Sequence, residues 1–554
     1  MKFLWLDINA SYSHSSLALP ALEAQLDQNI REKCLWKVVT GTIKTRIEEI
    51  IPQILEFQPQ YIFATGWLFN IKYLLSVLSR TSAIDNTAKI VLGGPEFLGD
   101  NKKFLTDNPF VTAVFKGEGE SVFNKFISIA IENPGSDEWK FLPGFEYINN
   151  NGRSELEYIT KQPVITEDFP SLKYPETSQF FNWDKAFIQL ETSRGCFNSC
   201  RFCVSGIDKS PVQNISIDDI RKRLTNISSQ GIKEIRILDR TFNANPKRAI
   251  EMIDLFEEFK GELKFHLEVH PALLNDMLKE RLSAIPEDLL HIEAGIQSLD
   301  EGVLASCARR GTAAQAIDGL KFLLGNSNYE VHTDFIAGLP GYSFEMLVKD
   351  IRSMIMIRPH EIQLELLKLL PGTCFRYEAG IYGIKYSSEP PYEVLQTPSI
   401  SYKELQTVMV ISKILEYWYN DTEWREVFAD IVSCEPDFLK KLYSFLEGTN
   451  FMESLHSFET RSLILYNFCC ENYPNHLKNI TLQWIRCGLS LKKEPAKHLI
   501  HWNIKDNDIN NPLFDPANRL KTYYYIDIES VRYWFAFNKS ENRNKPVANC
   551  REII

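Results

Sequence analysis

The chain has 554 residues, 44% of them hydrophobic and 24% charged, a balance typical of a globular protein with several domains. No apolar run reaches the roughly 18 residues that a membrane-spanning helix needs, and Asp7 interrupts the N-terminal apolar stretch, which favours a buried strand over a signal peptide or a membrane contact. The net charge of −11 disfavours binding to nucleic acid, and eleven cysteines without a secretion signal predict a cytoplasmic protein without a disulfide framework.

The N-terminal part alternates between strand-like and helix-like segments. Strand-like apolar runs lie at 2–9, 36–42, 60–66, 89–93 and 111–116. Helical stretches lie between and after them, at 17–29, 44–57, 70–80, 99–106 and 119–132. Five such units in series predict an α/β domain over residues 1–140, doubly wound and Rossmann-like, whose ligands bind beyond the carboxyl ends of the strands.

Residues 141–180 break this alternation and are expected to connect two domains. The alternation then returns, with strand-like runs at 186–192, 233–238, 263–269, 289–296, 329–336 and 361–367. Ser216, and Asn245 before Pro246, are typical of helix starts between these runs. Six βα units predict a partial (β/α)6 barrel over residues 181–390, and residues 391–554 are predicted to form a mostly helical domain.

Three cysteines are crowded directly after the first predicted barrel strand, in the pattern Cys196-Phe-Asn-Ser-Cys200-Arg-Phe-Cys203. Thiolates are soft ligands that hold iron–sulfur clusters or zinc. Three ligands on one loop suit a four-iron cluster with one iron left open to a substrate or cofactor. A structural zinc loop or unliganded cysteines are the alternatives, although the loop stands at the strand end where barrel chemistry takes place.

This motif, in this position, resembles the radical S-adenosylmethionine (SAM) superfamily. The resemblance implies that Cys196, Cys200 and Cys203 bind a [4Fe-4S] cluster and that Phe202, the aromatic residue before the third cysteine, lies at the SAM site. It further implies that reductive cleavage of SAM at the cluster yields a 5′-deoxyadenosyl radical. An external electron donor such as flavodoxin or ferredoxin is then expected.

Further SAM contacts are implied at the carboxyl ends of the later barrel strands. The candidates are Asp239 and Thr241 after the second strand, Glu268 on the third, Gln297 and Ser298 at the end of the fourth, and Gly338 after the fifth. The superfamily usually has a Gly-Gly-Glu-like contact to the SAM amine after the second strand, and this chain departs from it. Arg309 and Arg310 either reach the SAM carboxylate or the cluster, or form a solvated helix end.

A doubly wound domain before such a barrel resembles the cobalamin-binding domain of the cobalamin-dependent radical SAM enzymes. The residues that match are Gly93-Gly94-Pro95-Glu96 and Gly117-Glu118-Gly119-Glu120. Loops at the strand ends supply the implied cobalamin contacts, which are Ser11, Thr65, Gly66, Trp67, Gly93, Gly94, Pro95, Glu96, Gly117, Glu118 and Gly119. The usual Asp-x-His-x-x-Gly motif is absent, so cobalt is bound by His14 or by no protein histidine, or the domain binds no cofactor.

The two resemblances cover about residues 1–370 and imply an enzyme, a cobalamin-dependent radical SAM methyltransferase acting on an unactivated carbon. A cobalamin-associated rearrangement or cyclisation, and a radical SAM enzyme without cobalamin, are the alternatives. A methylthiotransferase is expected to carry a second three-cysteine cluster upstream, where only Cys34 stands. The chain therefore resembles a branch whose helical C-terminal domain has no assigned role, and no motif identifies the substrate.

Overall fold

The computed structural model describes residues 1–11, 16–149, 157–206, 211–326, 328–497, 500–501, 513, 521–528, 531–538 and 548–553. His14 lies outside the described residues. The chain divides into two compact units, of which unit 1 holds Met1–Ser343 and Leu366–Leu405, and unit 2 holds Phe344–Glu365 and Gln406–Ile554. The domain boundaries predicted near residues 140, 180 and 390 stay predictions.

The first sheet of unit 1 is the predicted doubly wound one. Its strands are β1 (Lys2–Asn9), β2 (Leu35–Thr42), β3 (Tyr61–Thr65), β4 (Lys89–Gly93), β5 (Ala113–Phe115), β6 (Phe145–Asn149) and β7 (Glu157–Ile159), in the order β2-β1-β3-β4-β5-β6-β7. The first five run parallel, and β6 and β7 add antiparallel strands from the predicted connector. The carboxyl ends of β1 to β5 therefore meet at one edge, where the predicted ligand loops lie.

Helices cover both faces of this sheet. They are α1 (Ala18–Ala24), α2 (Gln28–Arg31), α3 (Ile47–Phe57), α4 (Ile71–Ile84), α5 (Lys102–Asp107) and α6 (Glu120–Glu132), with short 3-10 turns η1 (Pro95–Phe97), η2 (Glu138–Phe141), η3 (Phe169–Ser171) and η4 (Pro175–Thr177). Successive residues of β1 point to opposite faces, so Phe3 and Trp5 join one core and Leu4 and Leu6 the other. Each fully buried large apolar side chain contributes roughly 1.5–3 kcal/mol, which makes the two cores the main support of the domain.

The second sheet contains all six predicted barrel strands. They are β8 (Phe187–Leu190), β11 (Glu234–Ile237), β12 (Lys264–Val269), β13 (Leu290–Gln297), β14 (Glu330–Ala337) and β15 (Glu361–Leu366), in the order β15-β14-β13-β12-β11-β8. Buried apolar residues alternate along β12, β13 and β14 with polar residues that are partly exposed. The predicted partial barrel is confirmed, with a polar inner face and an apolar outer face.

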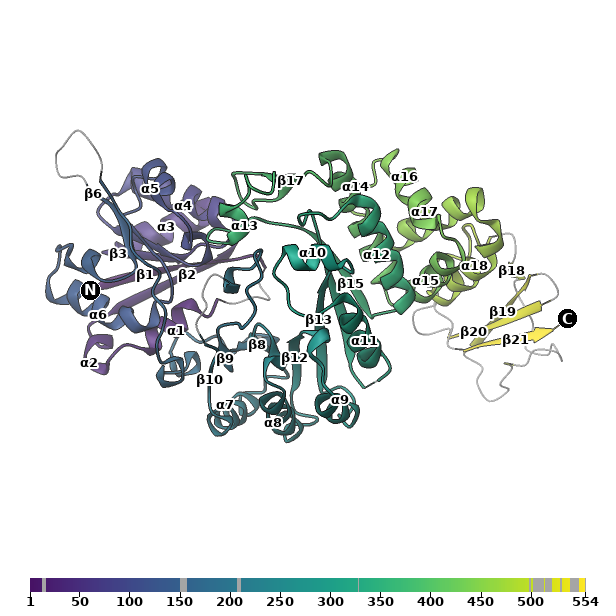
Figure 1. The fold of residues 1–554 in the computed structure, drawn as a ribbon, viewed down its shortest axis with the longest axis horizontal. Helices are drawn as coiled ribbons and strands as arrows, with labels where there is room; N and C mark the ends of the chain where they lie inside the picture. Colours follow the sequence, from purple (N-terminus) through teal and green to yellow (C-terminus); the bar gives the residue numbers. More distant parts are fainter. Residues whose placement is uncertain are drawn as a thin grey trace. The chain divides into compact units, whose positions relative to one another are not determined.

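The barrel helices begin where the sequence predicts. They are α7 (Ile217–Ser229), α8 (Pro246–Glu257), α9 (Asp276–Ser283), α10 (Glu301–Ser306), α11 (Ala313–Leu324) and α12 (Phe344–Ile357). Ser216 accepts a hydrogen bond from the backbone of Asp219, and Asn245 accepts bonds from Lys247 and Arg248. α7, α8 and α9 lie side by side along the strands (Figure 1). Short elements complete unit 1: β9 (Ser193–Arg194), β10 (Gln213–Asn214), β16 (Lys385–Tyr386), β17 (Val394–Gln396), α13 (Cys374–Tyr377), η5 (Val204–Gly206), η6 (Phe242–Ala244) and η7 (Pro271–Leu273).

Unit 2 is helical and then ends in a sheet. It contains α12 and nearly all of β15, both given above. Its further helices are α14 (Tyr402–Ile414), which begins in unit 1 and continues as a π-helical turn at Leu415–Tyr419, α15 (Arg425–Cys434), α16 (Phe438–Glu447), α17 (Phe458–Asn472) and α18 (Leu477–Arg486), with η9 (Pro474–His476). Four antiparallel strands follow: β18 (Ile500–His501), β19 (Lys521–Ile528), β20 (Val531–Asn538) and β21 (Ala548–Ile553). The C-terminal part is therefore mostly helical, as predicted, but it also contains this sheet. The pairing of β19 with β20 extends over eight residues of each strand, and such strands are stable only when they are paired.

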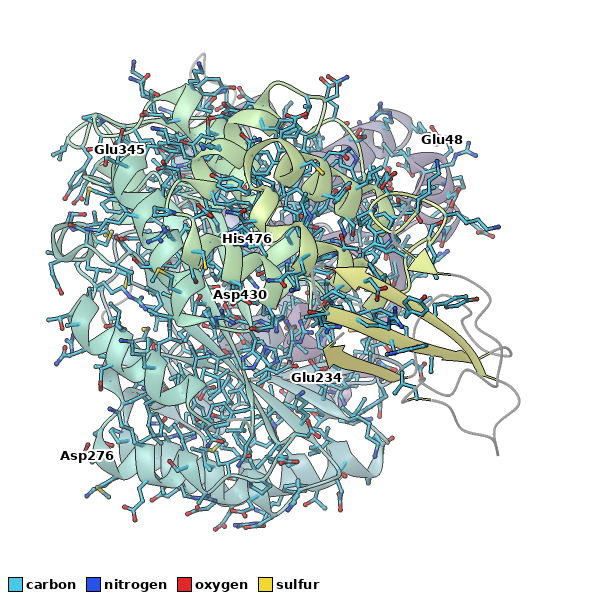
Figure 2. The ribbon with its side chains drawn as sticks, turned by 90° about the vertical axis from the view of Figure 1, so that its right-hand side faces the viewer. Glu48, Glu234, Asp276, Glu345, Asp430 and His476 are labelled. Atoms are coloured by element: carbon cyan, nitrogen blue, oxygen red, sulfur yellow. The ribbon has the colours of Figure 1, made fainter. Side chains whose placement is uncertain are left out.

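Polar contacts tie the helices of unit 2 together. Arg358 pairs with Glu426 and Asp430 of α15, and His476 Nε2 lies 3.1 Å from Glu435 Oε1; Asp430 and His476 are labelled in Figure 2. Trp424 is fully buried, and its indole donates to the Ser462 hydroxyl at 2.8 Å. In the described part of the chain, every helix is too short or too polar to cross a membrane.

Candidate active site

A cavity of about 720 Å³ in unit 1 is lined by both sheets. The first sheet contributes eight of the eleven predicted cobalamin contacts, which are Thr65, Trp67, Gly93, Gly94, Pro95, Gly117, Glu118 and Gly119. The barrel contributes the residues on both sides of the cysteine motif and the end of β11, which are Glu191, Ser193, Arg194, Gly195, Val204, Ser205, Leu238 and Arg240. Loops far apart in the sequence are thus brought together around one space.

The cavity has an apolar floor and a charged rim. Trp5, Phe63 and Phe126, which belong to one of the two cores, reach its floor. Glu118, Glu120, Arg194 and Arg240 lie among its polar lining residues. Such a combination suits a large ligand with a flat apolar body and polar substituents.

Two of the predicted loop glycines are required by the packing of the chain itself. Gly94 has a φ of +107°, and a Cβ atom there would lie 2.7 Å from the Gly66 carbonyl oxygen. Gly117 has a φ of +104°, and its Cβ would lie 2.2 Å from the Val164 oxygen. Gly93 differs, because the nearest atom to its Cβ would be Phe115 Cβ at 3.9 Å. Gly93 is therefore the loop glycine that can carry a side chain into the cavity.

Three predicted cobalamin contacts are not among the residues that line the cavity: Ser11, Gly66 and Glu96. Glu96 is buried and accepts a hydrogen bond from the Tyr392 hydroxyl at 2.6 Å, and burial raises the pKa of its carboxyl. A Cβ at Gly66 would lie 2.8 Å from the Phe97 ring. Glu96 and Gly66 are thus engaged within the protein, and the cofactor contact of all three stays a prediction.

The three motif cysteines gather on one loop. Cys200 is buried, and Cys196 and Cys203 are partly exposed. Burial raises the pKa of Cys200, the positive charge of Arg309 opposes this, and the nearby Cys203 and Cys196 thiols raise the pKa further. Three thiols close enough to influence one another, with a cation beside them, are the donor set that a cluster of net negative charge requires.

Arg309 connects the cysteine loop to the end of β13. Its Nη2 donates to the Gly295 carbonyl at 2.6 Å, which excludes the alternative of a solvated helix end for this residue. Arg310 stacks on the Phe197 ring, with 5.0 Å between the guanidinium carbon and the ring centroid. Both arginines thus contact the loop or the strand end.

Gln297 offers a buried acceptor at the end of β13. Its φ of +70° and a register shift between Gly295 and Gln297 mark a local distortion of the strand. The Gln297 Oε1 atom is buried without a hydrogen-bond partner. Strained backbone and an unpaired polar atom are both costly, and they are typical of ligand sites.

Asp239 holds the start of the cysteine loop. Its carboxylate accepts from the Thr192 backbone at 2.8 Å, from the Thr192 hydroxyl at 2.5 Å and from the Ser193 backbone at 2.9 Å. These three donors occupy both carboxylate oxygens. The geometry therefore gives Asp239 a positioning role, whereas its predicted contact to SAM stays a prediction.

The remaining candidates surround the same strand ends. Thr241 Oγ1 lies 3.8 Å from Cys196 Sγ. Burial raises the pKa of Glu268 to about 7, the charge of Arg240 lowers it and Glu293 raises it, so Glu268 lies near a residue that lines the cavity. Ser298 is fully buried and Gly338 has a φ of +86°, while Phe202 is half-buried beside Cys203.

Sequence reasoning missed two residues at this site. Arg194 Nη2 lies 3.0 Å from Glu120 Oε1 and 2.6 Å from Glu191 Oε2, and its Nη1 lies 3.4 Å from Glu118 Oε2. His270 is buried with both ring nitrogens unpaired, and burial lowers its pKa to about 3. The position of Arg194 before Gly195-Cys196, with Glu191 three residues earlier, was the available signal, but no local pattern indicated that Arg194 pairs with Glu118 and Glu120.

Comparison with known families identifies the domain that carries the cysteine motif. Residues 190–354 match the family model described as the radical SAM superfamily. This part of the chain is a radical SAM domain. The chain is accordingly a radical SAM enzyme, whose cofactors are a [4Fe-4S] cluster and SAM. Residues 380–502 match a second model, described as a protein of unknown function (DUF4080).

Curated relatives of this radical SAM enzyme are distant. An uncharacterized methyltransferase of Pyrococcus horikoshii is 24% identical over 357 residues, which are 63% of this chain and 76% of that protein. A tRNA-2-methylthio-N(6)-dimethylallyladenosine synthase of Herpetosiphon aurantiacus is 21% identical over 238 residues, 41% of this chain and 53% of the relative. The chain thus spans about half the length of the second relative.

Solved structures share the fold of this radical SAM enzyme. The cobalamin-dependent SAM radical enzyme OxsB, with aqua-cobalamin bound, has a TM-score of 0.60 at 15% identity, covering 89% of this chain and 82% of its own. The radical SAM methyltransferase TsrM from Kitasatospora setae, with cobalamin and a [4Fe-4S] cluster bound, has a TM-score of 0.53 at 14% identity and covers 70% and 78%. At these identities the likeness concerns the fold alone.

Proposed function

We propose that this chain is a cobalamin-dependent radical SAM methyltransferase that acts on an unactivated carbon. The observation that carries the proposal is the single cavity lined by the loops after β3, β4 and β5 and by the residues flanking the cysteine motif. Cobalamin bound by the loops of the first sheet would then lie across the cavity from the cysteine motif. The folds of OxsB and TsrM, whose structures hold cobalamin, support the same arrangement.

The cysteine loop and the strand ends would hold the cluster and SAM. When bound, the reduced cluster supplies the electron that cleaves SAM to a 5′-deoxyadenosyl radical, and cobalamin supplies the methyl group. Arg309, next to Cys200, would stabilise negative charge on the cluster or the SAM carboxylate. The unpaired Gln297 oxygen would accept a hydrogen bond from a ribose hydroxyl.

The first sheet's side of the cavity fits cobalamin in its chemistry. The floor is aromatic, and the loop glycines keep the strand ends free of side chains. In the described part of the chain no histidine lines the cavity. We therefore propose that the loops after β3, β4 and β5 bind cobalamin without a histidine ligand to cobalt. His14, which follows β1 in the sequence, is the one other candidate for that ligand in the first domain.

The charged residues at the rim of the cavity would select the substrate. The electron that reduces the cluster would come from a separate donor protein. Arg240 and Glu118, both lining residues, favour a substrate with charged or polar groups beside the carbon that is methylated. Flavodoxin or ferredoxin is the proposed class of electron donor. A methylthiotransferase reaction is not favoured, because Cys34 is the one cysteine before Cys196, whereas a methylthiotransferase is expected to carry a second three-cysteine set there.

The test is anaerobic reconstitution with iron, sulfide and hydroxocobalamin, followed by desalting and measurement of bound iron and cobalamin. About four irons and one cobalamin per chain, with a labelled methyl group passing from SAM to product, would support the proposal. Four irons without cobalamin would overturn it and leave a radical SAM enzyme of another reaction. Cobalamin binding without methyl transfer would favour rearrangement or cyclisation instead.

A matched pair of variants locates the cobalamin. Gly93→Leu places a side chain in the cavity at a position with open space, so cobalamin should be lost while the iron content stays unchanged. Gly380→Leu is the control, since Gly380 also has open space around it and does not line the cavity. Equal cobalamin retention by both variants would contradict the proposed location.

A further inference from the structure

Three metal-binding side chains meet near the amino-terminal ends of two neighbouring barrel strands. His291 is the second residue of β13, and Glu330 and His332 are the first and third residues of β14. The strands are parallel, with His291 paired to Glu330 and Glu293 paired to His332. Alternate residues of a strand share a face, and the residues between these three are buried, so all three point to the inner face of the barrel.

The donor atoms of these side chains are close enough to share one ion. His291 Nε2 lies 3.2 Å from His332 Nδ1, and the other ring nitrogen, His291 Nδ1, lies 3.4 Å from Glu330 Oε2, so only one of the two His291 nitrogens would hold the ion. One donor atom from each residue can be chosen so that all lie within 4.8 Å of one another. Donor atoms around tetrahedral zinc, with bonds of about 2.0–2.1 Å, stand about 3.3 Å apart. The Glu330 side chain is 59% exposed, so it is free to rotate toward this spacing.

Neighbouring strands hold the histidine rings in place. His266 on β12 stacks on His291, with ring centroids 4.5 Å apart and an angle of 16° between the planes. His266 Nε2 in turn lies 3.1 Å from Glu293 Oε2. The His332 ring packs edge-on against His291 at 4.1 Å. Rings held by such partners lose little freedom when they bind an ion, as is usual for metal-ligating histidines.

The charges around the three side chains suit a cation. Glu330 and Glu293 bring two carboxylates, against the nearby ammonium group of Lys264. On the next strand Arg236 is paired with Glu234, with 3.0 Å between Nε and Oε1, so its charge is compensated. The local balance therefore does not oppose a divalent ion.

We infer that His291, His332 and Glu330 form a site for a divalent transition metal, with zinc as the ion we expect. Two imidazoles and one carboxylate suit zinc or ferrous iron, whereas calcium and magnesium prefer oxygen ligands alone. Gln297 is six residues further along β13, which at about 3.3 Å per residue places the metal about 20 Å from the strand end beside the cysteine loop. The ion would tie β13 to β14, and this face of a barrel serves stability, not chemistry.

The test uses the full-length protein with its cluster loaded, so that the three motif cysteines are occupied. Equilibrium dialysis against radiolabelled zinc should give about one zinc per chain, and zinc should raise the midpoint of thermal unfolding. His332→Ala should weaken zinc binding by more than about a hundredfold, because loss of an outer partner alone costs about 10–100-fold. The midpoint of this variant should no longer respond to zinc.

Two further variants separate metal binding from folding. Glu330→Gln changes an exposed side chain, so it should fold like the wild type and still bind zinc at least about tenfold more weakly. Glu48→Gln, at an exposed position of α3 and labelled in Figure 2, is the control and should bind zinc like the wild type. Absence of zinc from the wild type, or equal affinity in wild type, His332→Ala and Glu330→Gln, would overturn the inference and leave a hydrogen-bonded triad.

Discussion

Arg194 of the cysteine loop is bound to Glu120 at the start of α6, with 3.0 Å between Nη2 and Oε1. The two residues are 74 positions apart in the sequence, with Glu120 on helix α6 beside the first sheet and Arg194 on the short strand β9. Glu118 and Glu191 complete the ring of acids around the guanidinium. This ion pair therefore links the loop that carries the cluster cysteines to the loop of the proposed cobalamin site.

Arg194→Ala should loosen that link and leave three carboxylates uncompensated. We expect the free energy of unfolding to fall by roughly 2–4 kcal/mol, because breaking a largely buried ion pair strands its partners. Cobalamin retention after desalting should fall more than iron content does. Arg221→Ala is the control, since its pair with Glu258 is exposed to solvent and its loss should change stability much less. Unchanged cobalamin retention in Arg194→Ala would contradict the link.

Cys200→Ala should abolish formation of 5′-deoxyadenosine and leave the fold intact. The reason is that a thiolate is lost from the three-cysteine loop, whereas an alanine fits the buried position. Cys307→Ala is a demanding control, because Cys307 is also buried, and burial together with the nearby Cys200 thiol raises the pKa of its own thiol. It should retain SAM cleavage. Continued deoxyadenosine formation by Cys200→Ala, measured by liquid chromatography, would remove the cluster assignment.

Asp239→Asn tests positioning against direct contact with SAM. In the variant an amide NH2 group replaces one of the two carboxylate oxygens that accept hydrogen bonds from Thr192 and Ser193. At least one of these donors loses its acceptor, so the free energy of unfolding should fall by roughly 1–3 kcal/mol. Iron content after reconstitution should fall with it, while the molecules that retain a cluster should bind SAM with unchanged Kd. A raised Kd for SAM at full iron content would instead assign Asp239 to the SAM site.

Glu268 should make stability depend on pH. Burial raises its pKa from 4.5 to about 7, so the folded protein binds a proton more tightly than the unfolded chain does. The stabilising contribution is complete below about pH 4.5 and is lost as the pH rises through about 7. Glu268→Gln should therefore match the wild type at pH 5 and exceed it at pH 8.5 by on the order of 1–3 kcal/mol.

The measurement for Glu268 is urea unfolding at the two pH values. Glu251→Gln, at an exposed position of α8, provides the control and should shift stability equally at both. If Glu268 also binds SAM through its carboxylate, Glu268→Gln will bind SAM more weakly at pH 8.5. An identical stability difference at pH 5 and pH 8.5 would refute the raised pKa.

Local patterns in the sequence were enough to predict the two βα series and the cysteine loop. Alternation of period two, apolar runs and residues such as Asn245 before Pro246 act within a few neighbouring residues, and the structure has strands and helices at those places. The spacing of Cys196, Cys200 and Cys203 lies within one loop, so it also required no knowledge of the fold. The strand-end positions of Gln297 and Glu268 followed from the same series.

Partners far apart in the chain were decided by the tertiary structure alone. Glu96 accepts a hydrogen bond from the Tyr392 hydroxyl, and Asp239 accepts hydrogen bonds from Thr192 and Ser193. The meeting of His291 with His332 depends on the register between β13 and β14, which no local pattern encodes. The physical reason is that periodicity specifies which face a side chain takes, whereas its partner is set by how strands from distant parts of the sequence are aligned and packed.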